Sequence, residues 1–475
     1  MEQLLLFKGF SHQEIQALQV NKVPLLICLD AYDEAKNTVK LSNLVKLNRL
    51  VELWGSCKFI FTSRAEVFGD LSILKCFEAP QKYGGAHVLE HYDVPGFNYE
   101  QQKLFMQKYL NHEEENSSKW WESVSPSWRQ ISTYERAIYK YQLADLTKTP
   151  FLLQAAMQVL PEVIEQMLDF EKTQKSKNTS EEVNQIKLTQ NEIIKGFIEK
   201  WFKREEQKLI EQGKQDLFIT QAIMWRYASK LAYHMTTEQE HYFQVNTEQI
   251  LTGWRSQLLN IENDRTHILW AAIPKKGSSG QEQWLHKSIM DYLVLNYQMQ
   301  GMIEETKDIG NDQKKIIIES LNVPSMLNEI SFLKMWRDTL LMDKSNIFQQ
   351  KLLDVIELSK TEDVGVAAAI AISALNGARV SFSGMNLKGI NVKGANLRNG
   401  IFYLTDLSNA DLRNTNMAHS MLIHTKLIGA KMEGVNFGEY PKLITGTKMI
   451  NSFDYSPDES QIAIGDNAGD IKVWD

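Results

Sequence analysis

The sequence predicts a multidomain protein with an α/β domain near the amino end, helical domains in the middle and a repeat solenoid followed by short β-strands. Three observations predict it: an unbroken apolar run at Pro24–Leu29, helical periodicity from Val94 to Leu375, and a large apolar residue at every fifth position from Phe382. The first pattern is typical of a buried strand, the second of amphipathic helices and the third of stacked repeats. A chain of 475 residues is long enough for three or more such domains.

Composition is that of an ordinary soluble globular protein, with 43% hydrophobic residues, 23% charged residues and a formal net charge of −7. The mild acidity argues against a non-specific nucleic-acid partner. Cys28, Cys57 and Cys76 are widely spaced and odd in number, which favours reduced thiols over a disulfide frame or a metal site. Met1–Phe10 is too short and too polar for a secretory signal. Val364–Leu375 falls short of the roughly 20 residues of a membrane helix, so we expect a cytoplasmic protein.

Two apolar runs predict neighbouring strands of a parallel sheet. Pro24–Leu29 reads as a strand buried on both faces, and Lys58–Arg64 as a second strand that ends in polar groups. The polar side chains at their ends are Asp30, Asp33 and Glu34 for the first, and Thr62, Ser63 and Arg64 for the second. Ligands bind at the carboxyl ends of such strands, and carboxylates facing hydroxyls and a guanidinium suit a magnesium–triphosphate. The alternative is two core strands with charged loop ends.

The segment LLICLDAYDE resembles the extended Walker B of the NACHT family of STAND signalling NTPases, and FIFTSR resembles its sensor strand. Ala31 stands where that family usually has Gly. The resemblance implies that Asp30 holds Mg²⁺ through water, that Asp33 or Glu34 positions the attacking water, and that Arg64 senses the terminal phosphate. It also implies ATP or ADP as the cofactor.

The phosphate-binding loop of that family is missing. GxxxxGKS or GxxxxGKT occurs nowhere in the chain, and the nearest fragments are Gly213–Lys214 and Gly277–Gly280. Only about twenty residues precede the first strand, so residues 1–93 are expected to be an amino-terminally truncated NACHT domain. Without the phosphate-binding loop, the chain as given is expected to be inactive, although its intact parent would be a slow switch-type NTPase. Within it, Ser11–Leu18 predicts a helix with a capping box at Glu14.

Residues 94–170 predict a helical domain. Asn98 is expected to cap its first helix, and residues 111–140, which carry Trp120, Trp121 and Trp128, are expected to form a packed insertion. Pro150 falls in the first turn of a helix, where its missing N–H costs nothing. That segment resembles the family's proline motif, which packs against adenine; the alternative is a plain first-turn proline. Residues 171–190 read as a linker.

Residues 191–302 predict a winged-helix-like domain. Asn191–Leu209 is an amphipathic helix, and Leu269–Ile273 with Glu282–His286 is expected to form the hairpin of the wing. WLHKSIMDYL resembles the family's winged-helix segment, whose histidine touches the diphosphate at rest. His286 is therefore the candidate latch, against the alternative of a structural histidine. Residues 303–378 predict a helical spacer or a layer that covers the end of the next domain.

Residues 379–440 form the most regular stretch of the sequence. The apolar residues at every fifth position are Phe382, Leu387, Val392, Leu397, Phe402, Leu407, Leu412, Met417, Leu422, Leu427, Met432 and Phe437. The residue two places before each is mostly small, and neither helix nor flat strand has this period, so a solenoid is predicted. GANLR, NADLR and GAKME resemble the pentapeptide-repeat family, which implies a right-handed quadrilateral β-helix with four repeats per coil.

Residues 441–475 carry short alternating strands, a turn at Asn467–Gly469 and a terminal Trp474–Asp475. They resemble one WD-repeat blade. A propeller needs roughly four to eight blades, so this incomplete propeller is expected to be cut as well.

Two functions follow from these resemblances. The first is a fragment of a STAND signalling ATPase in which exchange of ADP for ATP controls self-association, while the pentapeptide and WD repeats bind a ligand or protein partner. The second is a non-catalytic scaffold, because the chain lacks a phosphate-binding loop. An enzyme with unrelated chemistry finds no metal-ligand cluster or nucleophile motif in the sequence to support it.

Overall fold

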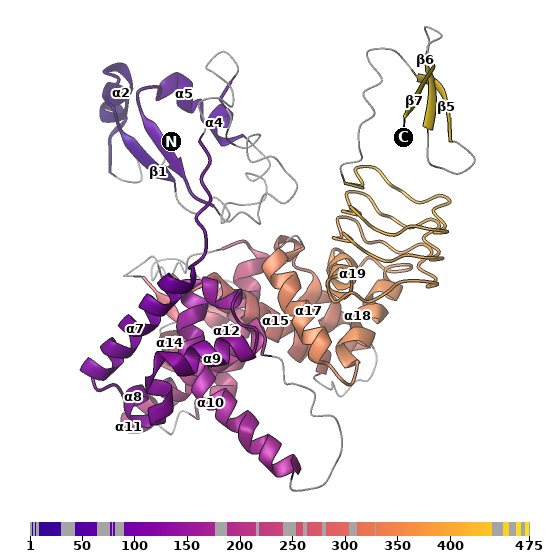
Figure 1. Ribbon diagram of the computed structural model, residues 1–475. Helices are drawn as coiled ribbons and strands as arrows, with labels where there is room; N and C mark the ends of the chain where they lie inside the picture. The colour runs from indigo at the N-terminus through magenta and orange to yellow at the C-terminus, as the bar shows by residue number, and fades with distance from the viewer. Residues whose placement is uncertain are drawn as a thin grey trace.

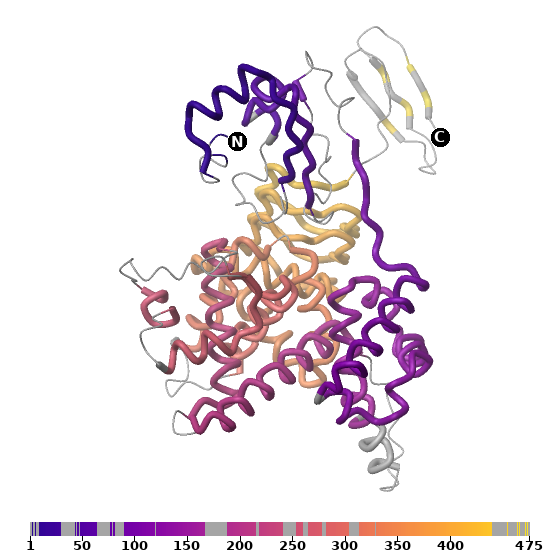
Figure 2. Tube along the Cα trace, turned by 90° about the vertical axis from the view of Figure 1, so that its left-hand side faces the viewer, coloured from indigo at the N-terminus to yellow at the C-terminus, as the bar shows by residue number. Residues whose placement is uncertain are grey.

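The computed structural model describes residues 2, 5, 9–29, 43–63, 77, 79–80, 90–175, 188–214, 218–240, 253–259, 264–277, 282–303, 311–327, 329–438, 450–455, 462–466 and 471–474. Figure 1 shows a small α/β unit at the amino end, a large helical body, a stack of coils and a small sheet at the carboxyl end. Most of the described secondary structure is helical and the sheets are small. In Figures 1 and 2 the extended segment 90–98 runs from the amino-terminal unit to the helical body.

The amino-terminal unit contains the predicted pair of parallel strands. Its elements are α2 (His12–Val20), β1 (Leu26–Leu29), α4 (Leu44–Leu47), α5 (Leu50–Leu53) and β2 (Lys58–Phe61). β1 pairs with β2 in parallel, with Leu26 opposite Lys58 and Leu29 opposite Phe61. The capping box predicted at Ser11 and Glu14 is confirmed at the start of α2.

The expectation that the first strand is buried on both faces is wrong for the described residues. One face of the sheet packs on a small core consisting of Ile15, Val45, Leu50, Trp54, Phe77 and Ala79. On the other face Leu26 is 64% exposed and Ile60 47%, and Cys28 beside them is also exposed. An unbroken apolar run permits burial on both sides of a sheet but does not supply the layer that would cover the second side.

The helical body is built from α7 to α19 and three short 3₁₀ turns. They are α7 (Tyr99–Glu115), α8 (Lys119–Ser123), η5 (Pro126–Arg129), α9 (Ile131–Lys140), η6 (Leu146–Lys148), α10 (Pro150–Lys175), α11 (Gln190–Glu211), α12 (Gln221–Thr237), α13 (Trp254–Leu258), α14 (Asp264–Ala272), α15 (Lys287–Ile303), α16 (Asn311–Leu321), η8 (Pro324–Met326), α17 (Ile330–Met342), α18 (Ile347–Leu358) and α19 (Ala367–Gly377).

Several local predictions for these helices are confirmed. Asn98 caps α7 in a capping box with Gln101. The tryptophan-bearing insertion is packed, with Trp128 buried against Tyr134. Pro150 is the first residue of α10, but that helix continues to Lys175, five residues into the stretch expected to be a linker. The apolar stripe expected on α11 faces the core, where four of its side chains, Ile194, Phe197, Ile198 and Phe202, are buried.

The wing is displaced from its expected place. Residues 269–272 belong to helix α14, and the hairpin consists of β3 (Lys275–Lys276) paired antiparallel with β4 (Gln283–Trp284). The prediction that residues 269–272 belong to the first strand of the hairpin is therefore wrong. A short apolar run containing two alanines does not separate strand from helix, and alanine has the highest helix propensity. The carbonyl of Ala272 at the end of α14 accepts a hydrogen bond from Trp201 Nε1 at 2.9 Å.

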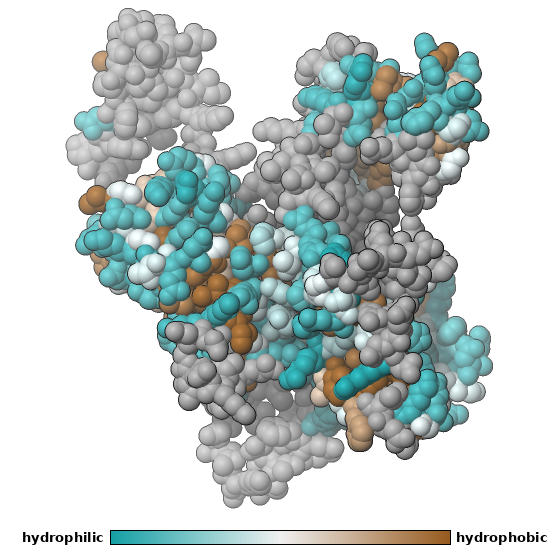
Figure 3. Space-filling view, turned by 180° about the vertical axis from the view of Figure 1, so that it is seen from behind, coloured by the Kyte–Doolittle hydropathy of each residue, from teal (hydrophilic) through white to brown (hydrophobic). Residues whose placement is uncertain are grey.

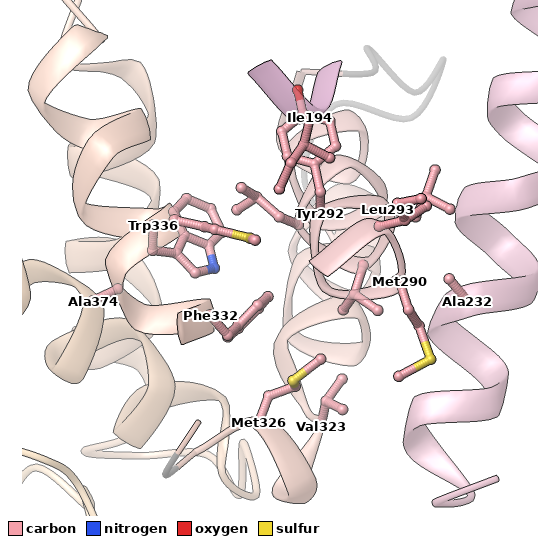
Figure 4. Packing of buried hydrophobic residues seen from close by; sticks show 14 of the residues in the cluster. Ile194, Ala232, Met290, Tyr292, Leu293, Val323, Met326, Phe332, Trp336 and Ala374 are labelled. Atoms are coloured by element: carbon pink, nitrogen blue, oxygen red, sulfur yellow. The ribbon is translucent and has the colours of Figure 1, made fainter. Parts of the chain in front are cut away.

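Helix α15 lies at the centre of the body. In Figure 4 its side chains Tyr292 and Leu293 lie among residues of several other helices, with Phe332 and Trp336 of α17 on one side and Ala232 of α12 on the other. This apolar core is continuous from α7 to the coils at the carboxyl end of the body. The helices and the first coils therefore share one core.

Residues 382–437 form the predicted solenoid. Each isolated β-bridge joins residues that are twenty apart, as Asn386 with Asp406 and Asn416 with Asn436, so four pentapeptides complete one coil. Residues after the solenoid form a three-stranded antiparallel sheet of β5 (Ile450–Tyr455), β6 (Ile462–Asp466) and β7 (Ile471–Trp474), in that order.

Candidate functional site

The solenoid is held together by its inward side chains. The fully or nearly fully buried residues at the predicted positions are Phe382, Leu387, Val392, Leu397, Phe402, Leu407, Leu412 and Met417. In the last coil the equivalent residues, Leu422, Leu427, Met432 and Phe437, are only partly buried. The rings of Phe382 and Phe402 stack with centroids 5.1 Å apart, one coil above the other.

The corners of the coils are a feature that sequence reasoning missed. Every fifth residue from 384 to 434 has a positive φ, and most of these residues are Gly or Asn, which tolerate that conformation. Leu404, His419 and His424 are the exceptions, with φ of 57°, 58° and 56°. The signal was readable in the sequence as Gly or Asn two places after most of the inward residues.

One face of the solenoid is apolar. Its exposed side chains are Ile401, Tyr403, Leu404, Met421 and Ile423, which are between 39% and 56% exposed and which we call the apolar face. Ile401 and Met421 are bridged neighbours in adjacent coils, and the N–H of Leu404 donates to the carbonyl of Ile423 at 3.1 Å. The five side chains therefore occupy two adjacent rungs of the same face.

Helices α18 and α19 cover the first coil. Buried Ser373 of α19 accepts a hydrogen bond on Oγ from the N–H of Asn396 at 2.8 Å, and Ser359 Oγ accepts one from the N–H of Asn391 at 3.1 Å. Asn376 Nδ2 donates to the carbonyl of Arg398 at 3.0 Å. These bonds satisfy groups at the end of the β-helix that would otherwise be unpaired. The spacer predicted for residues 303–378 thus includes a layer on the solenoid.

Four of the eight residues of the predicted nucleotide site lie outside the described residues. Asp30, Asp33, Glu34 and Arg64 belong to this group. Thr62 and Ser63 directly follow β2 in the amino-terminal unit, where Thr62 is exposed and Ser63 half-buried, and the N–H of Thr62 donates to the carbonyl of Leu29 at 3.1 Å. The ends of the two predicted strands are therefore adjacent, whereas the proposed roles of the side chains beyond them stay predictions.

The structure brings together the segments of Pro150 and His286. Phe151, next to Pro150, stacks on the imidazole of His286 with centroids 4.2 Å apart and an interplanar angle of 9°, and it also contacts Phe197 of α11. His286 Nδ1 accepts a hydrogen bond from the N–H of Ser288 at 3.1 Å, at the start of α15. In the neutral ring this places the proton on Nε2, which is then the donor.

A buried ionic cluster follows His286. Asp291 is 1% exposed, and Lys287 Nζ lies 3.2 Å from its carboxylate and 2.8 Å from Glu329, which precedes α17. Ser331 Oγ also donates to Asp291 at 3.3 Å. Charged groups at such depth need partners, and this set joins α15 to α17. The cluster accounts structurally for two charged positions of the segment WLHKSIMDYL.

A groove of about 780 Å³ lies between α11, α12 and α15. It is lined by Lys195, Arg226, Lys230 and Arg265 with one carboxylate, Glu199, and by the rings of Trp225, Tyr227 and Tyr292. Four cationic side chains against one carboxylate suit an anion. Sequence reasoning missed this groove because its residues are spread over positions 195–300 on several successive helices, and local periodicity does not show which of their faces meet.

Comparison with known protein families finds a match in one part of the chain. Residues 378–414 and 401–438 match the family described as Pentapeptide repeats, with 8 copies. Such repeats often serve as protein-interaction modules. No curated protein matches the sequence. Among the helices that the structure describes, none combines the length and apolar character needed to cross a bilayer.

Proposed function

We propose that this chain is a protein-interaction scaffold whose solenoid presents a recognition surface at a fixed orientation to the helical body. The observation that carries the proposal is the junction between α19 and the first coil. Ser373 is buried there and bonds the β-helix backbone, and the apolar core continues from the helices into the coils. A repeat array joined in this way moves with the body instead of swinging on a linker. A reducing compartment such as the cytoplasm suits the free thiols of Cys28 and Cys57.

The scaffold can be tested by placing a photo-crosslinking amino acid on each face of the solenoid in the full chain. Tyr403, Lys388, Lys393 and Arg398 are equivalent positions, each directly after an inward residue, on the four successive faces. In native cells we expect a discrete protein adduct from at least one of them. Tyr139 on α9, which is 86% exposed, is the control outside the solenoid. If no protein adduct forms from any of the four positions, the scaffold proposal is contradicted.

A second candidate is the nucleotide-controlled switch of a NACHT-type STAND ATPase, with repeats that bind a partner and subunits that associate when ATP replaces ADP. The stacking of Phe151 on His286 favours it, because it joins the two helical segments expected to contact adenine and diphosphate. Under this proposal Asp30 holds Mg²⁺ through water, Asp33 or Glu34 positions water, and Thr62, Ser63 and Arg64 face the phosphates. The terminal strands β5 to β7 would be a WD blade.

Nucleotide binding separates the two candidates. For the switch, ADP or ATP should bind the full chain with Mg²⁺ at micromolar concentration, and Asp30→Ala should abolish binding. Glu14→Ala, in the capping box of α2, is a control of similar charge change away from the strand ends. If no binding is detected at millimolar nucleotide, the switch proposal is refuted and the scaffold proposal stands.

A further inference from the structure

The apolar face is an exposed hydrophobic surface on an otherwise polar solenoid. Ile401 and Met421 lie on one side of the inward residues, and Tyr403 and Ile423 on the other, in two coils joined by backbone hydrogen bonds. Contiguous exposed apolar patches of this kind mark interaction sites more often than single exposed residues do. Figure 3 shows one side of the molecule coloured by hydropathy, on which hydrophilic residues predominate among the coloured atoms and apolar residues form small groups.

The fold of the coils does not require apolar side chains at these positions. The equivalent outward positions on the other three faces are mostly polar or charged, and they include Lys388, Lys393, Arg398, Ser408, Arg413 and Glu433. Ile428, which follows Ile423 by one repeat, is 80% exposed but stands alone among polar neighbours of its own face. Only on the apolar face do large apolar residues recur in successive coils. Leu404 in addition adopts a positive φ, a strained choice for that residue.

Charge indicates the chemistry of the occupant. Residues 379–438 contain seven Lys and Arg and three Asp and Glu, a net charge of +4, although the whole chain carries −7. The neighbouring faces place Arg398 on one flank of the apolar face, and Lys388, Asp406 and Lys426, with a net charge of +1, on the other. An acidic partner is therefore attracted, whereas an isologous contact between two copies of this face would bring two positive solenoids together.

The size of the face limits the occupant to a short segment. The two rungs are about 4.8 Å apart, as in any β-sheet, and five half-exposed side chains cover a few hundred Å². A stable interface between folded proteins buries about 800 Å² on each partner, which is more than this face offers. The side chains are mainly aliphatic, so they do not form the aromatic platform on which nucleic-acid bases stack.

We propose that the apolar face binds a short segment of another protein in which two or three large apolar side chains lie between acidic residues. The proposal deepens the scaffold function and rests on it. Ile423 and Met421 contact the apolar side chains of the segment, and the basic residues on the flanks attract its carboxylates.

The test uses the full chain with the photo-crosslinking amino acid at position 403. Mass spectrometry of the adduct identifies the crosslinked segment, which is then synthesised, labelled and titrated with wild-type chain and with two variants. Ile423→Ser should weaken binding about tenfold or more, because it removes an aliphatic side chain that the bound segment would cover. Ile428→Ser is the matched control, since it is the same change at the equivalent position on the next face, and should alter binding less than about twofold.

The supporting result is an adduct on a segment of another protein that is both apolar and acidic, with binding that weakens as the salt concentration rises. An adduct with a second copy of this chain, with nucleic acid or with a basic segment would overturn the proposal, as would equal effects of the two serine variants. Adducts from another face but none from position 403 would refute this proposal and leave the scaffold intact. An absence of adducts from all four faces would refute both.

Discussion

At the scale of single residues, the corners of the solenoid depend on backbone conformation. Gly389 has a φ of 76°, and a Cβ added to it would meet no atom within 4 Å, so its replacement tests strain alone. We expect Gly389→Ala to lower the free energy of unfolding by about 1 kcal/mol, because alanine is strained in the left-handed region. Lys388→Ala, next to it and exposed, should change stability by less than about 0.5 kcal/mol in the same denaturant titration. Equal effects would show that the corner is not strained.

The buried carboxylate of Asp291 gives a second prediction at this scale. Lys287→Met keeps the length of the side chain but removes a cation that lies 3.2 Å from the Asp291 carboxylate. The free energy of unfolding should fall by about 3–5 kcal/mol, because the buried carboxylate loses a cationic partner. The double variant Lys287→Met, Asp291→Leu should recover most of this loss. If the single variant melts like the wild type in thermal denaturation, the cluster is not a structural link between α15 and α17.

At the scale of elements, the solenoid depends on its inward residues. Leu407 is fully buried, and Leu407→Asp should unfold its coil at a cost of about 3–5 kcal/mol, since it removes an apolar group and buries a polar one. Lys393→Asp, at an exposed position directly after the inward residue Val392, should have little effect. Circular dichroism during thermal melting measures both, and an unchanged melting temperature for Leu407→Asp would contradict the inward assignment.

The junction between α19 and the solenoid gives a further prediction. In Ser373→Ala the N–H of Asn396 loses its acceptor, and a buried unpaired donor costs about 1–3 kcal/mol. Ser383→Ala, on an exposed position of the first coil, is the control. Hydrogen exchange should show faster exchange at Asn396 in the first variant alone; unchanged exchange would mean that the junction does not depend on this bond.

At the scale of the whole molecule, the described residues contain two separate cores. The small one belongs to the amino-terminal unit, and the large one runs from α7 into the coils. We expect calorimetry to resolve two unfolding transitions, because so small a core is only marginally stable. Trp54→Ala should destabilise only the amino-terminal unit, and Phe332→Ala only the helical body with its coils. In each case we expect the free energy of unfolding to fall by about 3–5 kcal/mol and only the corresponding transition to move to lower temperature. A single transition that shifts with both variants would show one cooperative unit.

The local elements were predictable from nearby residues. Ser11 and Glu14 determined the start of α2, as Asn98 determined that of α7, because a cap is a contact over three residues. The five-residue period predicted the solenoid, and the same sequence also contained the Gly and Asn corners that we missed. The prediction of a strand at residues 269–272 was wrong, because their short apolar run fits a helix as well as a strand.

The sequence by itself determined the caps, the amphipathic stripe of α11 and the stacking of the repeats, all of which follow from spacing along one segment. Only the tertiary structure decided that Leu26 and Ile60 are left exposed, that Phe151 stacks on His286, and that Ile401 and Ile423 form one surface. These outcomes depend on contacts between residues twenty to more than a hundred positions apart. Such contacts form only when the chain closes long loops around a shared core, and local periodicity does not specify which segments meet there.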